Sequence, residues 1–389
     1  MSRLDRALNI AELKRIARRR LPPPLFHYIN GGADDEGTRF GNHRAFSQVR
    51  LVPEYLVDVS SVDASTTVLG QPIEWPVMCS PTGMSRLFHH EGELAVARAA
   101  RRAGTCYSLS TLGTCSIEEV AAVNDGPKCF QIYVMRDRAI TREFIARCKE
   151  AGFTSLALTV DVPVGSNRER ELRYGFSLPP KLRPATFLGM ASRPAWCFNH
   201  LRTRRVNFAN MAHLAGQGVD GAALMEYVAD QFDPSVTWDD MAWMIEEWGG
   251  PFAIKGILSP ADAVRAAEAG CSAIMVSNHG GRQLDESITP FDALPGMVEA
   301  VGDRCEIILD GGVRRGTDVL KALALGADAV SMGRPYLWGL AAGGEAGVDR
   351  ALAILRQEVE TGLALLGCRR LDEIRPHHVV PAPAQDFRA

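Results

Sequence analysis

The feature that most constrains the fold is a repeated alternation of short strand-like runs with helix-like segments between residues 77 and 332. The strand-like runs lie at Val77 to Ser80, Thr105 to Leu109, Cys129 to Val134, Ser155 to Val160, Phe252 to Ile254, Ala273 to Val276, Glu306 to Leu309 and Ala327 to Met332. Helix-like segments separate most of them, at Glu91 to Arg102, Ser116 to Val123, Arg142 to Ala151, Ala261 to Ala269 and Thr317 to Leu325. Eight strands alternating with helices predict an α/β fold, a parallel (β/α)8 TIM barrel.

A doubly wound open sheet is the alternative arrangement of strands and helices. Such a sheet usually carries a Gly-x-Gly-x-x-Gly fingerprint directly after its first strand. The first strand here is followed by Pro81-Thr82-Gly83, and the fingerprint is missing. We therefore favour the barrel.

The chain of 389 residues is interpreted as a single domain, residues 1–389, with an N-terminal segment at 1–74 and the barrel at 75–376. In the N-terminal segment, Ala11 to Arg20 predicts a helix that ends at Leu21-Pro22-Pro23-Pro24, because proline cannot continue it. Phe26 is expected to anchor the core. Tyr28 carries a hydroxyl that could point either into the core or into a pocket.

The alternation breaks once, where about 90 residues separate Asp161 from Phe252. A connection of this length in a compact domain is usually functional or mobile, so we expect an insertion loop at 177–235 after the fourth strand. Residues 186–212 interleave Phe187, Trp196, Phe198 and Leu201 with several arginines. This composition suits the interface of an anionic membrane, a lid or a subunit contact, and does not choose among them.

Composition excludes several classes of function. The formal net charge of −3 gives no reason to expect nucleic-acid binding. The nine cysteines form no Cys-x-x-Cys pair, so reduced thiols are expected, with neither a zinc site nor disulfides. No window reaches the roughly 18 apolar residues of a membrane span, and residues 1–20 lack the apolar core of a secretion signal. A cytoplasmic protein is expected.

Polar residues and glycines follow the predicted strands at the ends that meet at the mouth of a barrel. They are Pro81-Thr82-Gly83, Ser110-Thr111, Gln131-Ile132-Tyr133, Thr159-Val160-Asp161, Lys255-Gly256, Ser277-Asn278-His279, Asp310 to Arg314 and Gly333-Arg334. Barrel enzymes place their chemistry at this face. The sequence therefore predicts one active site there.

The stretch Ser277 to Asp285, with sequence Ser-Asn-His-Gly-Gly-Arg-Gln-Leu-Asp, is the most informative of these ends. His279 can take a proton near neutral pH, and the Arg282 guanidinium matches the shape of a carboxylate. Gly280 and Gly281 let a ligand approach the backbone. A lone His-x-x-Arg would more often be a surface loop, but its place at a strand end favours a catalytic role.

The last two strand ends predict a phosphate site. Asp310-Gly311-Gly312 with Arg314, and Gly333 with Arg334, offer backbone N–H groups and guanidinium charge on consecutive loops. Barrel enzymes commonly bind phosphate after strands seven and eight.

Lys255 and Asp161 each have two interpretations. Lys255 could be a Schiff-base lysine or a charge beside an electron-accepting ring. Asp161 could orient His279 and stabilise its imidazolium. A structural ion pair is the alternative for both residues.

Taken together, these motifs resemble the FMN-dependent L-2-hydroxy acid dehydrogenases and oxidases, most of all (S)-mandelate dehydrogenase and the bacterial L-lactate dehydrogenases. The resemblance extends from Leu21 to about Cys368 and rests on Ser277 to Asp285, Leu158 to Asp161, Gln131 to Tyr133, Lys255-Gly256 and Asp310 to Gly316. It implies oxidation of an L-2-hydroxy acid to a 2-keto acid, with FMN as cofactor.

The resemblance also implies roles for individual residues. On the substrate side, His279 is the base, Asp161 its partner, Arg282 and Tyr28 bind the substrate carboxylate, Arg168 helps to hold the substrate, and Tyr133 bonds near its hydroxyl. On the cofactor side, Lys255 stands by the N1/O2 edge of FMN, Ser110, Gln131 and Thr159 contact its ring, Pro81, Thr82 and Gly83 pack by N5, Arg314, Gly333 and Arg334 hold the phosphate, and Ser277, Asp310 and Gly312 complete the cofactor site.

Two positions bear on the substrate. Gly83 stands where related oxidases often have alanine, and Leu112 stands where glycolate oxidase has tryptophan, which implies a larger pocket and a medium or aromatic acid. Lactate remains an alternative.

The resemblance further implies a quinone or similar electron acceptor, a homotetramer, and peripheral contact with the inner face of the cell membrane through residues 186–212. An oxidase that forms hydrogen peroxide, and a barrel that binds a phosphorylated ligand without redox chemistry, are the competing functions.

Overall fold

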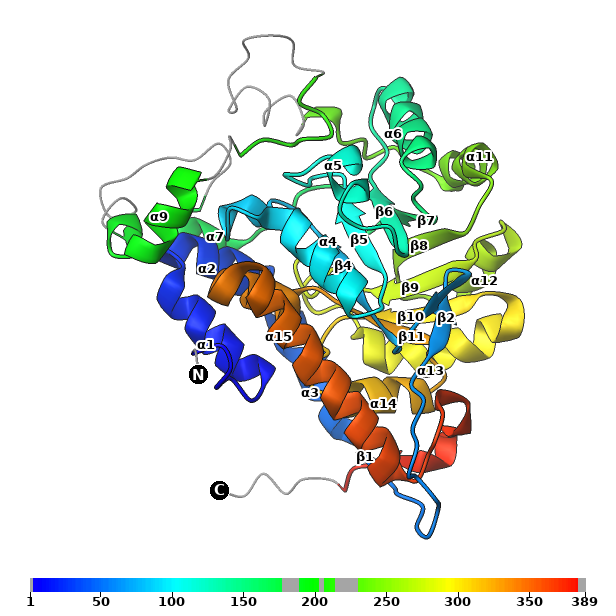
Figure 1. Ribbon diagram of the computed structural model, residues 1–389. Coiled ribbons are helices and arrows are strands. Elements are labelled where there is room, and N and C mark those ends of the chain that lie inside the picture. Colours follow the sequence, from blue (N-terminus) through cyan, green and yellow to red (C-terminus); the bar gives the residue numbers. More distant parts are fainter. Residues whose placement is uncertain (1–2, 177–188, 203–205, 214–229, 384–389) are drawn as a thin grey trace.

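The computed structural model describes residues 3–176, 189–202, 206–213 and 230–383. Its parallel strands close into an eight-stranded barrel in the order β10-β11-β4-β5-β6-β7-β8-β9 (Figure 1). The strands are β4 (Val77–Thr82), β5 (Tyr107–Ser110), β6 (Lys128–Ile132), β7 (Ser155–Thr159), β8 (Phe252–Ile257), β9 (Ala273–Ser277), β10 (Glu306–Asp310) and β11 (Ala329–Met332). The predicted barrel is confirmed, and the open doubly wound sheet is excluded because β11 pairs with β4.

All eight strands overlap their predicted runs, but β5 and β11 each begin two residues later than expected. The reason lies in the backbone of Thr105 and Ala327. Their N–H groups donate hydrogen bonds to the carbonyl oxygens of Ala100 and Ala322, which belong to the preceding helices, and not to a neighbouring strand. The turn that ends each helix therefore uses the first residues of the apolar run.

Helices surround the barrel and connect successive strands. They are α4 (Gly92–Arg102), α5 (Ile117–Ala121), α6 (Arg138–Glu150), α12 (Pro260–Glu268), α13 (Pro290–Val301), α14 (Gly316–Ala324) and, after β11, α15 (Arg334–Leu366). Ser116 and Glu119 form a reciprocal capping box at the start of α5, which satisfies two backbone N–H groups that the helix itself cannot pair. Within the described residues, no helix is both long enough and apolar enough to cross a bilayer.

The connection from β7 to β8 holds α7 (Glu169–Arg173), α9 (Pro194–Arg202) and α11 (Trp238–Trp248). The insertion loop predicted at 177–235 falls largely on residues 177–188, 203–205 and 214–229, which lie outside the described residues.

Alanine, cysteine and methionine side chains, with one isoleucine, fill the interior of the barrel. They come from Met78, Cys106, Cys129, Ala157, Ala253, Ala273, Met275, Ile308 and Ala329, all buried. A hairpin of β2 (Thr66–Val68) and β3 (Gln71–Ile73) adds Val68, Leu69 and Ile73 to the same cluster. Glu306, at the start of β10, accepts a hydrogen bond from the Leu69 N–H, so the hairpin closes the end of the barrel where the strands begin.

The N-terminal segment lies beside the last helix. It contains α1 (Ile10–Arg20), α2 (Pro23–Asn30) and α3 (Gly37–Arg44), and Figure 1 shows α1 running next to α15. The short strand β1 (Val49–Leu51) pairs antiparallel with β12 (Val379–Pro381) near the C-terminus. Short 3-10 helices occupy connections at η1 (Ala45–Gln48), η2 (Ser85–Leu87), η3 (Gly302–Arg304), η4 (Leu371–Glu373) and η5 (Pro376–His378).

Two observations concern side chains that the sequence singled out. Phe26 is buried in the main core cluster. All nine cysteines are free thiols, and most of them are buried.

The register of the barrel brings polar strand ends side by side. Thr159 pairs with Lys255 across β7 and β8, and Ser277 pairs with Asp310 across β9 and β10. Because all strands run in one direction, these residues reach the same face of the barrel.

Candidate active site

One cavity lies at the mouth of the barrel, where the strands end. All predicted site residues except Asp161 and Ser277 line it: Tyr28, Pro81, Thr82, Gly83, Ser110, Gln131, Tyr133, Thr159, Arg168, Lys255, His279, Arg282, Asp310, Gly312, Arg314, Gly333 and Arg334. The two exceptions lie behind the wall, where Asp161 bonds to His279 and Ser277 bonds to Lys255. The tertiary structure therefore gathers the whole predicted set.

His279 is held by the carboxylate of Asp161, which follows β7. Its Nδ1 lies 2.9 Å from Asp161 Oδ1, and its backbone N–H donates to Ser277 Oγ at 3.1 Å. Since an ionised carboxylate only accepts, Nδ1 carries the proton and Nε2 keeps its lone pair. Residue 279 has φ of 56°, a left-handed backbone that is unfavourable for a residue with a Cβ. The fold thus positions this imidazole at some cost in backbone strain.

The protonation states of this pair follow from burial and from the neighbouring charges. Loss of solvent lowers the pKa of His279 below its usual value, although Asp161 opposes the shift. Burial by itself would raise the pKa of Asp161, but His279 and Lys255 outweigh it and hold that pKa below its usual value. The result is a neutral imidazole beside a carboxylate, which is the arrangement that a general base requires.

Two guanidinium groups share the cavity with His279, and one carboxylate pairs with both of them. The Arg282 guanidinium lies 4.7 Å from the ring centroid of Tyr28, and its Nη2 is 3.2 Å from Glu171 Oε1. Arg168 Nη1 is 3.8 Å from the same oxygen, and Arg168 Nη2 donates to Gln283 Oε1 at 3.2 Å. Both arginines line the cavity, so they can present N–H groups to a bound carboxylate.

Lys255 belongs to a buried network with Asp310. Its Nζ is 3.0 Å from Asp310 Oδ2 and donates to Ser277 Oγ at 2.9 Å. Ser277 and Ser80 in turn donate to the two oxygens of Asp310. Burial opposes the lysine cation, but Asp310 and Asp161 outweigh it and raise the pKa of Lys255. A lysine that stays charged does not fit the Schiff-base interpretation and supports that of a fixed positive charge.

The other end of the cavity holds Arg314 and Arg334. Burial lowers the pKa of Arg314 to about 10 and takes that of Arg334 well below its usual value. Arg334 donates to the backbone carbonyls of Ile29, Gly31 and Gly280, each at 2.8 to 2.9 Å. Within the described part of the chain, neither guanidinium has a carboxylate within 4.0 Å. Buried cations without counter-ions indicate an anionic ligand.

Glycine is required at Gly312, next to these arginines. Its φ is 82°, and a Cβ there would lie only 2.0 Å from the backbone oxygen of Asn42. The N-terminal segment therefore packs directly on the loop that follows β10, and no larger residue could stand there without moving it.

Comparison with known proteins decides the family. Residues 17–381 match the family of FMN-dependent dehydrogenases. The chain belongs to this family. As a member, it binds FMN and oxidises a 2-hydroxy acid.

Relatives of this FMN-dependent dehydrogenase are similar over nearly its whole length. A putative L-lactate dehydrogenase of Mycobacterium tuberculosis is 44% identical, with 97% of this chain and 90% of the relative covered. An L-lactate oxidase of Nostoc sp. is 43% identical, with coverage of 96% and 98%. The crystal structure of the monotopic membrane protein (S)-mandelate dehydrogenase superposes with a TM-score of 0.93 at 35% identity, covering 97% of this chain and 100% of that one.

The cavity of this FMN-dependent dehydrogenase fits its cofactor. Gln131 Nε2, Thr159 Oγ1 and Ser331 Oγ are buried and lack a hydrogen-bond partner among the described residues, and all three residues line the cavity. Unpaired buried polar atoms are unfavourable unless a ligand pairs them. The oxygens and nitrogens of the flavin ring offer such partners, and Arg314 and Arg334 offer charge for its phosphate.

Gly83 and Leu112 both line the cavity, and they touch each other. A Cβ on Gly83 would lie 3.0 Å from Leu112 Cβ and 3.0 Å from Leu112 O. An alanine at position 83 would therefore press on Leu112. The two positions have to be considered as one unit of the pocket wall.

Glu171 and Phe232 are two residues of the site that sequence reasoning missed. Glu171 was visible only as part of the charged run Arg168 to Glu171, which is more often a solvated helix face. The signal that could have identified it is its spacing of three residues from Arg168, which places both on one side of a helix. Phe232 lies at the end of the β7 to β8 connection and carried no motif.

A second cavity of about 480 Å³ adjoins the first. The two share Tyr133, Thr159, Val162 and Phe232, and the rings of Tyr133 and Phe232 lie 5.0 Å apart. Among the described residues that line the second cavity, none is Lys, Arg or His. It therefore suits a neutral, apolar molecule better than an anion.

The helix α9 corrects one detail of the expectation for residues 186–212. Trp196, expected at a membrane interface, is buried, and its Nε1 donates to the Leu87 carbonyl at 2.8 Å. The expectation for Trp196 was wrong because the indole completes the core instead. Phe198 and Leu201 on the same helix are exposed. Residues 186–188 and 203–205 of the predicted stretch lie outside the described residues.

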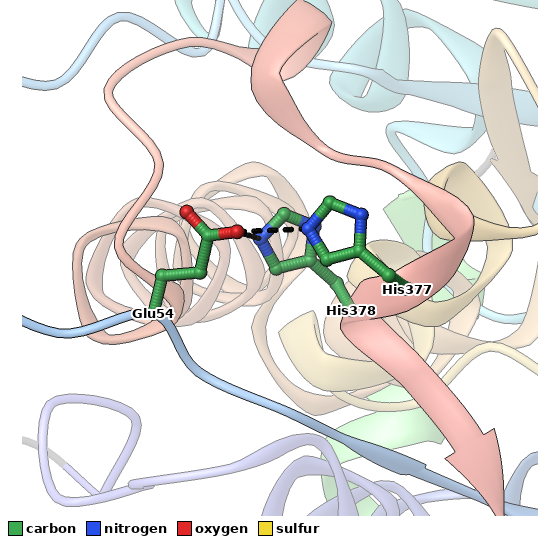
Figure 2. A group of neighbouring side chains, drawn as sticks. All are labelled: Glu54, His377 and His378. Carbon is green, nitrogen blue, oxygen red and sulfur yellow. Dashed lines mark hydrogen bonds and ion pairs between the residues drawn. The ribbon is translucent and has the colours of Figure 1, made fainter.

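Glu54, His377 and His378 form a cluster of ligating side chains that lines neither cavity (Figure 2). Glu54 Oε1 is 2.8 Å from His377 Nε2 and 3.8 Å from His378 Nε2. The Arg375 backbone N–H donates to His378 Nδ1 at 3.0 Å, so the proton of the neutral ring is on Nε2. A metal would need the lone pair of that nitrogen. The cluster therefore joins two segments of the chain and gives no argument for a metal.

Proposed function

We propose that this dehydrogenase oxidises an aryl or branched L-2-hydroxy monocarboxylic acid to the 2-keto acid and passes the electrons to a quinone or a similar acceptor. The observation that carries the proposal is the neutral His279 imidazole, oriented by Asp161 at 2.9 Å, beside the cavity arginines Arg168 and Arg282. A base and a carboxylate binder within one cavity suit a substrate that carries an acid and an acidic hydrogen on adjacent atoms.

At the substrate end, His279 Nε2 accepts a proton from the substrate. Asp161 stabilises the imidazolium that forms and holds the ring in the tautomer that leaves Nε2 free. Arg168 and Arg282 bind the substrate carboxylate, with Tyr28 beside Arg282, and so present Cα to the base. The Tyr133 hydroxyl bonds near the substrate hydroxyl.

At the cofactor end, bound FMN supplies the acceptor for the electron pair that leaves the substrate. Lys255, kept charged by Asp310, contributes a positive charge beside the ring, and Ser277 orients its ammonium group. Ser110, Gln131 and Thr159 bond to the ring, and Pro81, Thr82 and Gly83 form the wall beside it. Arg314 and Arg334, with the backbone of Gly312 and Gly333, hold the phosphate.

The choice of an aryl or branched acid over a smaller acid rests on Gly83 and Leu112. Neither residue carries an aromatic side chain into the cavity, which leaves room for a substituent on Cα. Structures of (S)-mandelate dehydrogenase and of mandelate oxidase with (S)-mandelic acid align over 97% of this chain. Lactate is the second candidate, because a putative L-lactate dehydrogenase and an L-lactate oxidase are 44% and 43% identical.

The second cavity supports a neutral acceptor. It shares the Tyr133 and Phe232 wall with the substrate cavity, and no cation of the described chain lines it. The variant Val236→Trp fills this cavity and is expected to slow reoxidation of the flavin by a short-chain quinone, whereas Val236→Ala keeps it open. Equal rates of quinone reoxidation in both variants would contradict a quinone site there.

The alternative is an oxidase that uses oxygen and releases hydrogen peroxide. The observation that favours it is the similarity to L-lactate oxidase and glycolate oxidases at 41 to 43% identity. A stoichiometric peroxide assay under air separates the two functions. Peroxide equal to the keto acid formed, with no rate increase from quinone, would establish the oxidase.

The proposal extends to the setting of the enzyme. It includes a cytoplasmic homotetramer of single-domain subunits. Each subunit consists of an N-terminal segment at 1–74 and a barrel at 75–376, with an insertion loop at 177–235 within the barrel. The tetramer binds the inner face of the cell membrane through residues 186–212. The exposed Phe198 and Leu201 on α9, and a structural relative that is a monotopic membrane protein, support peripheral attachment. Vesicle flotation of wild type and of Phe198→Ser with Leu201→Ser tests it, and equal flotation of both would contradict it.

The experiment that tests the central proposal is anaerobic bleaching of the flavin absorbance by a panel of L-2-hydroxy acids. Mandelate and 2-hydroxyisocaproate should bleach it fast, lactate slowly and glycolate least. Fast bleaching by lactate alone would move the enzyme to the lactate dehydrogenases. No bleaching by any member of the panel would overturn the proposed substrate class.

A further inference from the structure

We infer that Glu171 sets the net charge of the substrate end so that it accepts a substrate with one carboxylate and rejects one with two. The inference rests on the proposed function, because it takes Arg168 and Arg282 as the residues that bind the substrate carboxylate. It makes Glu171 a positioning and specificity residue that acts through these two arginines.

The geometry places one carboxylate between two cations. Glu171 is buried, and its Oε1 lies 3.2 Å from Arg282 Nη2 and 3.8 Å from Arg168 Nη1. In the described part of the chain, no other carboxylate lies within 4.0 Å of either guanidinium. The two arginines are otherwise held by neutral groups: Arg282 donates to the Tyr28 carbonyl, and Arg168 donates to Gln283 Oε1.

The charges of Arg168, Arg282 and Glu171 sum to a single positive charge. Arg168 and Arg282 contribute two positive charges, and Glu171 contributes one negative charge when it is ionised; burial raises the pKa of Glu171, and the charges of Arg282 and Arg168 oppose that rise. A substrate with one carboxylate brings the group to neutrality. A second carboxylate would leave a net negative charge in a largely buried site, where a charge without a partner is costly.

The other charged groups near the substrate add no positive charge to this count. His279 is neutral, as its lowered pKa indicates, and its partner Asp161 stays ionised and adds one negative charge behind the cavity wall. Lys255 is balanced by Asp310 at 3.0 Å. Glu171 is therefore the residue that decides whether the arginine pair has room for one more negative charge or for two.

A purely structural role for Glu171 predicts a different result. Its helix α7 is short, and Arg168 lies three residues before Glu171 on the same side. If Glu171 only held the arginines in place, its loss would weaken all 2-keto acids by the same factor. If it sets the charge, its loss must change the preference between ligands that share one head group.

The test compares two 2-keto acids that differ in a distal carboxylate. Benzoylformate carries one negative charge and 2-oxoglutarate carries two, and both present the same keto acid head to the arginines. Their dissociation constants are measured by titration of the holoenzyme, followed by the change in flavin absorbance. A loss of arginine positioning would weaken binding of both ligands by the same factor, so it would leave the ratio of the two constants unchanged.

In Glu171→Gln, the ratio is expected to shift toward 2-oxoglutarate by about tenfold or more, since one buried charge is removed near the ligand. Glu171→Asp keeps the charge and should keep the wild-type ratio. Glu169→Gln on the same helix, where Glu169 pairs with the exposed Arg173, is the matched control and should leave the ratio unchanged. An unchanged ratio in Glu171→Gln overturns the inference.

A second variant tests the same idea by adding charge. Gln283→Glu places a new carboxylate beside Arg168 and brings the group to neutrality without a ligand. Benzoylformate should then bind about tenfold more weakly and 2-oxoglutarate more weakly still. Undiminished binding of both ligands would contradict the inference even if Glu171→Gln failed to fold.

The outcome is separate from that of the proposed function. The titrations need no turnover, so they can be read whether or not a 2-hydroxy acid bleaches the flavin. Failure of the whole panel to bleach wild type would overturn the proposed substrate class. A normal panel with an unchanged ratio in Glu171→Gln would overturn only the role of Glu171.

Discussion

The two ends of the active-site cavity each hold a pair of arginines, but in the part of the chain that the structure describes only one of the two pairs has a carboxylate beside it. At the proposed phosphate end, Arg314 and Arg334 have no carboxylate within 4.0 Å among the described residues, and Arg334 is held by backbone carbonyls. At the substrate end, Arg168 and Arg282 share Glu171. The number of uncompensated positive charges is therefore two at one end and one at the other.

This difference corresponds to the anions that the two ends are proposed to bind. A phosphate monoester carries close to two negative charges at neutral pH, and a monocarboxylic acid carries one. Because a buried charge is stable only when it is matched, each arginine pair leaves uncompensated the charge that its ligand supplies. Charge balance, more than the number of arginines, therefore separates the proposed cofactor site from the proposed substrate site within one cavity.

The largest effect is expected from a substitution that removes the catalytic base and leaves the arginines at both ends of the cavity intact. His279→Gln should keep its bound FMN and yellow colour, while flavin reduction by the substrate slows by roughly 100- to 10,000-fold, because no group accepts the proton. Stopped-flow absorbance measures the rate. His377→Gln, an exposed histidine paired with Glu54, is the control. Near-normal reduction would remove His279 from its role.

The second-largest effect is expected from a substitution at the substrate end alone. Arg282→Met should weaken binding of the substrate carboxylate by roughly 2 to 4 kcal/mol, because a charge-assisted contact is lost, with the flavin content unchanged. The substrate dependence of flavin reduction measures it. Arg173→Met changes an exposed arginine nearby and should have no effect. An unchanged KM and rate in Arg282→Met would refute the assignment.

The reciprocal variant breaks the cofactor end. Arg314→Met should weaken FMN affinity by roughly 1.5 to 3 kcal/mol, as the loss of a hydrogen bond to a charged group does. Fluorescence titration of the apoenzyme with FMN measures it, and riboflavin, which lacks the phosphate, should bind both proteins alike. The neighbouring Arg315 is half-exposed and paired with Glu358, so Arg315→Met is the matched control. Equal FMN affinity in both variants would place the phosphate elsewhere.

The smallest effect is the pH dependence of the substrate end. A base must be neutral to accept a proton, so flavin reduction should be fast above the pKa of His279 and fall as the pH drops through it. Burial lowers that pKa, so the acid limb should lie below the usual histidine value near 6.5. At the cofactor end, Arg314 adds no limb of its own, because it stays charged up to a pKa of about 10. Only the FMN phosphate, whose second pKa is about 6, titrates there in this range. If the rate of flavin reduction fell with a midpoint above pH 6.5, the argument that burial lowers the pKa of His279 would be contradicted.

Local patterns were sufficient to predict the barrel and most of the cavity. The strand-like runs gave β4 to β11 within two residues at their first residues, because apolar β-prone residues flanked by glycine and polar turns have few alternatives. The polar residues after them, such as Lys255 and His279, could be assigned to one site because parallel strands end at one face. The motif Ser277 to Asp285 added Arg282 through its spacing from His279.

Other features depended on packing between distant segments, and the sequence misled or was silent. Trp196 has the composition of an interfacial residue, but it completes the core by bonding to Leu87. Gly83 and Leu112 form one unit of the wall, although 28 residues separate them. Glu171 has the sequence context of a solvated charged run, but it lies 3.2 Å from Arg282, which belongs to the loop after a different strand.

By itself, the sequence determined the barrel, the face that carries the chemistry and the residue types available there, because these follow from periodicity and strand direction, which are local. Only the tertiary structure decided which charges balance one another. Net charge at a point depends on distances between groups that the chain brings together from far apart. Arg168, Arg282 and Glu171 form a group with one free positive charge because the loop after β9 folds against α7.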